Sequence, residues 1–303
     1  MLSVIVCTHN PRQDYFQQCV DALRQQTLPY EQWQILLVDN QSAQPLAGRV
    51  DLSWHPTAST VREETLGLTA TRMRGIRESK GGLLVFVDDD NVLDPDFLEV
   101  AQRTMAERPF LGSWSGQCRP SFESPPPEWT RRYWGNLVIR EFDHDIWSNL
   151  PRLPESMPCG AGLCVRREVA LRYVELHESG KRPFQFDRNG KSLLSGGDND
   201  LAACACDLGL GVGLIASLKL THLISPQRLT LDYLARLAEG IQYSGALLDY
   251  FWNGKLEPPL SFHRKIARRL RVASMGHEHA EIARAVERGM RRARVTVASL
   301  RQE

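Results

Sequence analysis

Three consecutive aspartates follow a short apolar run, Leu83–Val87, in the first third of the sequence. Carboxylates crowded at one strand end repel one another unless a cation joins them. Oxygen ligands favour Mg²⁺ or Mn²⁺, which take one or two protein carboxylates and fill the other positions with phosphate oxygens and water. An acidic cap on the next helix is the alternative, but Asp94 and Asp96 already serve that position. Asp88 and Asp90 are therefore predicted to hold a divalent metal ion.

Side chains that could take part in a reaction or bind a metal occur at two further places, and both are weaker signals. Asp198 and Asp200 lie at the predicted start of a helix, where the helix dipole alone favours acidic residues. His222 follows an apolar run, and a lone histidine there is more often a packing or surface residue than a ligand. Residue type and position alone therefore do not assign a function to these three residues.

The elements that position these residues alternate along the first hundred residues. Apolar runs predict strands at Leu2–Cys7, Gln34–Val38 and Leu83–Val87. Helical spacing predicts helices at Gln13–Gln26, Gly67–Ser79 and Pro95–Glu107. Strands buried on both faces and alternating with helices indicate an α/β protein with a wound, mostly parallel sheet flanked by helices.

Polar residues gather at the carboxyl ends of these three strands. They lie in Cys7–Asn10, Asp39–Asn40 and Asp88–Asn91. Ligands of wound parallel sheets bind at the carboxyl ends of the strands. The coincidence predicts one ligand site at this edge of the sheet.

The segment from Ser113 to residue 158 has little periodicity and is rich in proline, tryptophan and arginine. A long irregular segment within a compact domain is usually a functional loop, although a decorative insertion is the alternative. Arginine binds phosphate bidentately and sugars stack on aromatic rings, so Trp129 and Trp134 are predicted to contact an acceptor. Beyond this segment, the pattern predicts a helix at Leu201–Leu208, a strand at Gly211–Leu220 and helices after Arg228.

Composition excludes several classes of protein. The 303 residues suffice for one large α/β domain with a helical appendage. The net charge of +1 creates no global field that would recruit nucleic acid. The seven scattered cysteines indicate reduced thiols and a reducing compartment. Cys204 and Cys206 lack partners at zinc-ligand spacing, so helix packing is favoured for them.

The location expected from the sequence is cytoplasmic. The N-terminal run has the pattern of a first strand and lacks the basic region and cleavage site of a signal peptide. No apolar stretch approaches the ~20 residues of a membrane helix. The protein is therefore expected to work in the cytosol or at the inner face of the membrane.

Several blocks of the sequence resemble the inverting family 2 glycosyltransferases, which have the GT-A fold. The blocks are Ser3–Arg12, Leu37–Ser42, Gly67–Gly75, Val85–Pro95, Gly160–Arg167, Gly197–Leu201 and Leu220–His222. Their order and spacing make the resemblance specific, although no single block would. The resemblance implies an enzyme that moves a sugar from a nucleotide-diphospho-sugar to an acceptor hydroxyl with inversion. It implies a role in the synthesis of cell-surface polysaccharide or glycoconjugates.

The resemblance also assigns roles to individual residues. The implied contacts to a UDP-, GDP- or dTDP-sugar donor are Thr8, Asn10, Asp39, Arg72, Asp88 and Asp89. The implied ligands of Mg²⁺ or Mn²⁺ are Asp88, Asp90 and His222. The implied acceptor contacts are Gly160, Ala161 and Gly162, and the acceptor is a saccharide or a lipid-linked molecule. The implied catalytic base is Asp198, with Asp200 as second choice.

Three positions leave alternatives open or depart from the family's pattern. Arg72 either meets the donor phosphate or ties its helix to the sheet. Met73 stands where asparagine is usual. Gly197 stands where glutamate is frequent, so the acceptor contacts of that glutamate are not expected here.

The predicted organisation is a GT-A catalytic domain over residues 1–260 and a basic helical extension over residues 261–303. Within the catalytic domain, residues 1–112 are assigned to the nucleotide-sugar and 113–225 to the acceptor, with the long loop at 113–158. A helix near Ser261–Leu270 would carry apolar residues on one face between basic ones. It can lie on an anionic membrane, pack on the catalytic domain or form a homodimer contact. Packing or dimer contact is favoured because later glutamates dilute the charge.

Two other classes of protein are weighed. A sugar-nucleotidyltransferase or a dinucleotide-dependent oxidoreductase needs a glycine-rich phosphate loop after the first strand, and Cys7–Arg12 has no glycine. A non-catalytic nucleotide-sugar-binding protein would keep Asp39 and the metal carboxylates but could lose the base. Both Asp198 and Asp200 are present, which favours the enzyme.

Overall fold

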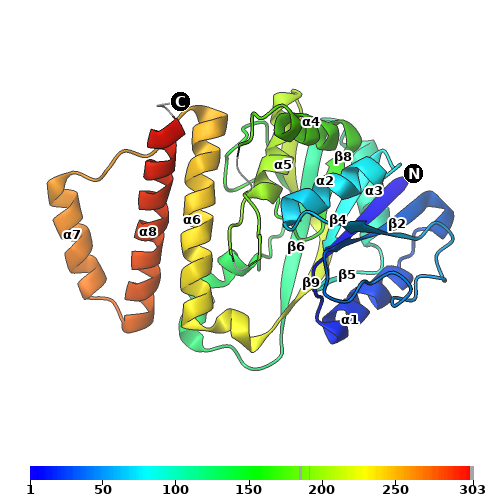
Figure 1. Ribbon diagram of the computed structural model, residues 1–303, viewed down its shortest axis with the longest axis horizontal. Helices are drawn as coiled ribbons and strands as arrows, with labels where there is room; N and C mark the ends of the chain where they lie inside the picture. The colour runs from blue at the N-terminus through cyan, green and yellow to red at the C-terminus, as the bar shows by residue number, and fades with distance from the viewer. Residues whose placement is uncertain (184–185, 191, 301–303) are drawn as a thin grey trace. The chain divides into compact units, whose positions relative to one another are not determined.

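The computed structural model describes residues 1–183, 186–190 and 192–300 (Figure 1). The chain forms two compact units. The first comprises Met1–Ser121, Val138–Gly190 and Gly197–Ile224. The second comprises Phe122–Leu137, Lys191–Gly196 and Ser225–Glu303. Each unit therefore depends on segments that are not contiguous in sequence.

The first unit is built on one sheet, with the strands in the spatial order β3, β2, β1, β4, β8, β6, β9 and β5, and with β7 paired to β9. Strands β1 to β5 span Leu2–Thr8, Trp33–Asn40, Ser59–Glu63, Leu83–Asp88 and Asn91–Leu93. Strands β6 to β9 span Leu111–Phe122, Ile146–Ser148, Leu163–Arg166 and Gly211–Ile224. Pairing is parallel from β3 through β2 and β1 to β4. The β4–β8, β6–β8, β7–β9 and β5–β9 ladders are antiparallel, and β4–β8 links the two halves of the sheet.

The parallel half of the sheet brings the predicted strand ends together. Every residue of β1 and β2 is buried, which explains why both strands are nearly continuous apolar runs. Thr8 pairs with Asp39 across β1 and β2, and Cys7 pairs with Asp88 across β1 and β4. The three predicted strands therefore end at one edge of the sheet, as the polar residues indicated.

Helices α1 to α5 belong to the first unit and span Gln13–Arg24, Leu68–Glu78, Phe97–Glu107, Arg167–Glu178 and Gly197–Asp207. α1 shows why such segments fold: Phe16, Cys19 and Leu23 form a buried stripe at helical spacing. α2 lies close to β1 because Gly75 has no side chain, and a Cβ there would lie 2.5 Å from Ile5 Cγ2. The three helices predicted in the first hundred residues are confirmed.

Several elements differ from the prediction. β8 and α4 lie in a stretch for which no element was predicted. β6 occupies the first residues of the segment predicted as an irregular loop from Ser113. β6 gave no strand pattern because it contains small residues where neighbours come close: a Cβ on Gly116 would lie 1.9 Å from the Leu218 carbonyl oxygen. α5 begins at Gly197, earlier than the predicted Leu201.

The second unit contains α6 (Leu231–Asn253), α7 (Phe262–Ala273) and α8 (His277–Leu300), with short 3₁₀ segments at Glu128–Leu137 and Pro226–Leu229. Figure 1 shows α8 running alongside α6. The two helices approach closely at Gly289, where a Cβ would lie 2.4 Å from the Glu239 carbonyl oxygen. The prediction of helices beyond Arg228 is confirmed. No helix among the described residues is both long and apolar enough to cross a membrane.

Six of the seven cysteines are buried, and Cys206 is partly buried. Burial raises the pKa of Cys7 to about 12, so this thiol is neutral at physiological pH. Cys204 donates to the Asp200 carbonyl oxygen at 3.2 Å within α5. Cys204 therefore packs within its helix, the role favoured for it from the sequence.

Candidate active site

The loop after β1 is fastened to the loop after β2. Asn10 has a φ of 49°, and its backbone amide donates to Ser42 Oγ at 2.9 Å. The Asn10 side-chain oxygen accepts from the Ala43 amide at 2.8 Å. His9 Nδ1 lies 2.6 Å from the Asn40 carbonyl oxygen. The polar ends of β1 and β2 are thus held as one surface.

Asp39 is buried in this surface. Its carboxylate accepts from the Ser42 amide at 3.0 Å, from the Leu46 amide at 3.1 Å and from Arg62 Nη1 at 3.1 Å. Burial alone would raise the pKa of Asp39, but the hydrogen bonds from Ser42 and Leu46 and the Arg62 charge outweigh it, so the pKa lies below its usual value. Asp39 is therefore ionised and fixed in place.

The aspartates after β4 lie beside β9. Asn91 pairs with His222 in the β5–β9 ladder, which brings His222 Nε2 to 3.4 Å from Asp90 Oδ2. Both side chains are buried. Burial and the neighbouring Asp90 carboxylate raise the pKa of Asp88 above its usual value. Thr8 Oγ1 donates to Asp89, which ties β1 to the same cluster.

The cluster contains a pair of candidate metal ligands. In the described part of the chain, no three or more His, Cys, Asp and Glu side chains are grouped as a metal site. Asp90 and His222 are brought together, whereas Asp88 is linked to them through its charge. Mg²⁺ and Mn²⁺ commonly take few protein ligands and complete their shell with phosphate oxygens. An oxygen and an imidazole nitrogen at this edge fit such an ion.

Arg72, on α2, lies at the centre of the site. Its Nη1 donates to both carboxylate oxygens of Asp187 at 2.9 Å, and the two side chains are only 4% and 5% exposed. Burial would lower the pKa of Arg72, but Asp187, Asp198 and Asp88 together hold it above its usual value. The guanidinium is thus a permanent cation that faces carboxylates from three parts of the chain.

Asp198 is held by backbone amides at the start of α5. Its Oδ2 accepts from the Gly160 amide at 2.6 Å, and its Oδ1 accepts from the Asn199 amide at 2.9 Å. A Cβ on Gly160 would lie 3.0 Å from Arg72 Nη2 and 3.2 Å from Asp198 Oδ2. Glycine at position 160 therefore lets the backbone approach both charged groups.

The remaining residues of this loop are close-packed. Gly162 has a φ of 64°, and a Cβ there would lie 2.7 Å from both Phe97 Cζ and Leu220 Cδ2. Ala161, between the two glycines, is buried. The predicted acceptor loop is therefore rigidly seated against β9 and α3.

Asp198 and Asp200 have different surroundings. Asp198 is half-buried. Asp200 is 0% exposed, and Arg182 Nε lies 3.1 Å and 3.0 Å from its two carboxylate oxygens. Arg182 therefore occupies and neutralises both oxygens of the Asp200 carboxylate. Of the two candidates, Asp198 has the more accessible carboxylate.

Trp129 and Trp134 belong to the second unit, in the 3₁₀ segment Glu128–Leu137. Trp134 stacks on Phe122 with a ring-centroid distance of 4.9 Å and donates to Thr130 Oγ1 at 3.3 Å. Trp129 lies 6.3 Å from the Tyr133 ring. Both tryptophans are half-buried, so their roles as acceptor contacts stay predictions.

Three functional partners were not predicted: Arg62, Asp187 and Arg182. Arg62 lies on β3, a strand for which the sequence gave no pattern. Asp187 and Arg182 lie in an irregular stretch with no motif. The sequence holds 37 Lys and Arg residues and 36 Asp and Glu residues, and it does not show which of them pair. These three residues could therefore be recognised only from the folded structure.

Met73, which stands where asparagine was expected, lines a cavity of about 330 Å³ beside α2. Thr69, Arg77, His177 and Arg182 line the same cavity. None of the predicted site residues is among its lining residues in the described chain. The departure at position 73 therefore shapes a separate surface of α2.

Comparison with known proteins agrees with this arrangement. The model of the family "Glycosyl transferase family 2" matches residues 3–170. The match covers more than half of the chain and includes β1, β2, β4 and the loop at Gly160. The chain belongs to glycosyl transferase family 2.

Two curated relatives are glycosyltransferases by name. "Putative glycosyltransferase EpsH" of Bacillus subtilis is 28% identical over 108 residues, which cover 35% of this chain and 30% of that protein. "Glycosyltransferase AglE" of Haloferax volcanii is 29% identical over 108 residues, which cover 35% of each chain. The chain thus aligns with about a third of the length of these relatives.

Solved structures share the fold. S. aureus TarS residues 1–349 in complex with UDP superposes with a TM-score of 0.53 at 15% identity, covering 99% of this chain and 91% of that one. The same protein in complex with UDP-GlcNAc gives a TM-score of 0.54 at 13% identity, with the same coverage. At this identity the likeness shows the fold alone. The predicted GT-A type α/β fold with helices at the C-terminal end is confirmed.

Proposed function

We propose that the chain transfers a sugar from a nucleotide-diphospho-sugar to an acceptor hydroxyl, with inversion at the anomeric carbon. The observation that carries the proposal is that the buried Arg72 guanidinium interacts electrostatically with both Asp198 and Asp88. Asp88 in turn interacts with the Asp90–His222 pair, so the half-buried Asp198 carboxylate and the candidate metal ligands share one charged neighbourhood. Family membership supports the transfer of sugars as the reaction class.

The proposed metal is Mg²⁺ or Mn²⁺, with Asp90 and His222 as its protein ligands. When bound, such an ion acts as a Lewis acid on the leaving diphosphate. Asp88 would contact the ribose or the ion through water. Burial, together with the neighbouring Asp90 carboxylate, raises the pKa of Asp88, and a bound cation would offset both effects.

The proposed donor is a UDP-sugar, with GDP- and dTDP-sugars as the alternatives. TarS, which shares the fold, is named in complex with UDP and UDP-GlcNAc. Asp39 would accept a hydrogen bond from the base, supported by its lowered pKa. Thr8 and Asn10 would border the nucleotide, because they lie at the same strand ends.

Asp198 is the proposed catalytic base. It would take the proton of the acceptor hydroxyl while that oxygen attacks the anomeric carbon from the face opposite the diphosphate. The two backbone amides on its oxygens fix the orientation of the carboxylate. General base catalysis of this kind contributes ~10²- to 10⁴-fold in rate. Asp200 is a weaker candidate because it is buried against Arg182.

The proposed acceptor is a saccharide or a lipid-linked molecule in polysaccharide or glycoconjugate synthesis. The loop Gly160–Gly162 would border it, because the Gly160 amide contacts the proposed base. Trp129 and Trp134, which are half-buried in the second unit, stay proposed contacts for acceptor rings.

The test compares Asp198→Asn with Asp200→Asn. Both proteins are assayed for release of UDP from UDP-sugars with Mn²⁺, and for UDP affinity by calorimetry. Asp198→Asn should lower turnover by ~10²-fold or more while UDP affinity stays unchanged, because the amide keeps the shape but accepts no proton. Asp200→Asn should mainly lower stability. A large loss of turnover only in a folded Asp200→Asn protein would reverse the roles.

A non-catalytic nucleotide-sugar-binding protein is the competing function. It predicts donor binding with no hydrolysis and no transfer. Incubation of the unaltered chain with UDP-, GDP- and dTDP-sugars and Mn²⁺ separates the two, since an active transferase releases nucleotide slowly even without acceptor. Thermal shift in the same mixtures reports which nucleotide binds.

A further inference from the structure

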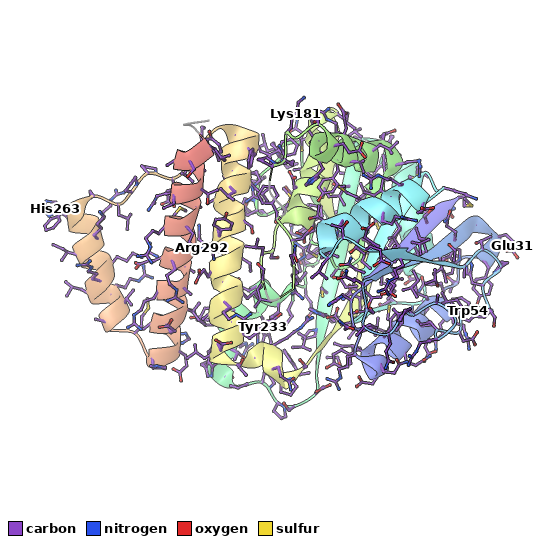
Figure 2. All side chains as sticks on the ribbon, in the orientation of Figure 1. Glu31, Trp54, Lys181, Tyr233, His263 and Arg292 are labelled. Atoms are coloured by element: carbon purple, nitrogen blue, oxygen red, sulfur yellow. The ribbon has the colours of Figure 1, made fainter. Side chains whose placement is uncertain are left out.

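α7 is the least buried helix of the second unit. None of its twelve residues is buried, and only Arg268 and Val272 are half-buried. Phe262, Ile266 and Leu270 are 71%, 42% and 68% exposed. Figure 2 shows His263 of α7 on the side away from α8. Within this chain, no other described element covers the apolar face of α7, as packing on the chain would require; the dimer contact also favoured from the sequence stays a prediction.

The exposed apolar residues form a continuous face. Phe262, Ile266 and Leu270 are four residues apart, so they lie in one row along the helix. Lys265 and Arg269 form a neighbouring row, one position before Ile266 and Leu270. An exposed apolar row beside a cationic row is the pattern of a helix that lies in a membrane interface.

The charge of α7 has one sign. The helix carries five Lys and Arg residues and no Asp or Glu. Arg268 pairs with Glu287 of α8 at 2.6 Å. The other four cations make no ion pair with any residue in the described ranges. They are Arg264, Lys265, Arg269 and Arg271.

Three of the five arginines of α8, Arg284, Arg288 and Arg292, make ion pairs with described residues, in contrast to one of the five cations of α7. Arg288 and Arg292 contact the two carboxylate oxygens of Glu239 on α6 at 3.0 Å and 2.9 Å. Figure 2 labels Arg292 in this position, between α8 and α6. These arginines hold the unit together and are neutralised by it. The charge available for an outside partner is concentrated on α7.

We propose that α7 docks the protein on the surface of a bilayer that contains anionic lipid. The apolar row would enter the boundary between headgroups and acyl chains, and the cations would meet lipid phosphates. Each basic residue near such a surface strengthens partitioning about fivefold. A second copy of the chain fits less well, because pairing of two α7 helices would place cations against cations. This proposal does not depend on the proposed reaction.

The test is co-sedimentation of the full-length chain with vesicles. The protein should pellet with vesicles of phosphatidylcholine mixed with phosphatidylglycerol and stay in solution with phosphatidylcholine alone. Binding should fall at high salt, because charge attraction is screened. Lys265→Gln with Arg269→Gln should weaken partitioning about 30-fold. Phe262→Glu with Leu270→Glu should abolish it.

Matched controls make the same kinds of substitution outside α7, to show that any loss of vesicle binding depends on where the charge or apolar residue lies. Val295→Glu changes an apolar residue of α8 that is 64% exposed and should leave binding unchanged. Arg24→Gln with Arg77→Gln removes the same charge from the first unit and should also leave it unchanged. All variants are surface changes, and circular dichroism checks that they are folded.

Three results would overturn the proposal. One is an intact chain that stays in solution with anionic vesicles at low salt. Another is equal weakening by the α7 and control variants. The third is a dimer, measured by light scattering, that dissociates in Phe262→Glu, because the face would then bind a second copy. Since the assay contains no nucleotide-sugar, its outcome is separate from that of the proposed function.

Discussion

Replacing Asp187 by asparagine removes the negative charge that faces Arg72. The two side chains are 4% and 5% exposed, so water does not take the place of the lost partner. Removing one member of a buried ion pair costs about 3–5 kcal/mol. The asparagine oxygen still accepts one hydrogen bond, and Asp198 and Asp88 still neutralise part of the charge. We therefore expect the free energy of unfolding to fall by about 3 kcal/mol, the lower end of that range.

The change should also affect turnover. Without Asp187, the Arg72 guanidinium is drawn toward Asp198, which makes that carboxylate a weaker base. Turnover should fall more than the affinity for the donor. Asp187→Glu keeps the charge and should retain more activity than Asp187→Asn, although the longer side chain crowds Gly197, where a Cβ would already lie 2.0 Å from Asp187.

The control is a second arginine of α2. Arg77 contacts Glu178 at 2.6 Å, but these side chains are 44% and 57% exposed. Glu178→Gln should lower the free energy of unfolding by less than about 0.5 kcal/mol. Both variants are unfolded in urea and followed by tryptophan fluorescence. If Asp187→Asn costs no more than Glu178→Gln, the burial argument for Arg72 is refuted.

Two further predictions concern the metal and the second unit. Asp90→Ala should remove the Mn²⁺-dependent part of UDP binding in calorimetry and leave binding in EDTA unchanged; near-normal turnover of this variant in EDTA would rule out the metal proposal. Glu239→Gln should lower stability at neutral pH by roughly 1 kcal/mol and flatten its acid dependence. Burial would raise the pKa of Glu239, but Arg288 and Arg292 lower it below the ordinary 4.5. Its contribution is therefore present above about pH 4.5 and lost as the pH falls through the lowered value. Urea unfolding between pH 7 and pH 3 checks this, and equal acid sensitivity of both proteins would contradict it.

The sequence predicted three of the four strands of the parallel half, β1, β2 and β4, because their signals are local. β1, β2 and β4 are buried on both faces and therefore appear as apolar runs, and each is followed by polar residues at its carboxyl end. The antiparallel half gave weaker signals. β6 contains glycine and serine where neighbouring strands come close, and β8 has only four residues. Their pairing depends on contacts far apart in the chain.

The site was predicted only in part, because some of its residues lie in local motifs and others come together only through folding. The family motifs named Asp90, His222 and Asp198, and the structure brings Asp90 and His222 within 3.4 Å. Residue type alone did not separate Asp198 from Asp200, because both are acids in the first turn of one helix, and only the family resemblance placed Asp198 first. Arg182, which buries Asp200, lies in a segment without regular pattern. Pairings of this kind become visible only when the chain is folded.

The division of the chain into interleaved units has a consequence for folding. The segment 122–137 and the short segment 191–196 leave the first unit and return to it. The short segment packs closely on α6, because a Cβ on Gly240 of α6 would lie 2.2 Å from the carbonyl oxygen of Leu193. A chain synthesised only to Ile224 contains every segment of the first unit, but it also carries these two segments of the second unit without α6. We therefore expect a protein cut after Ile224 to expose residues that the second unit normally covers, and to aggregate more readily than the intact chain.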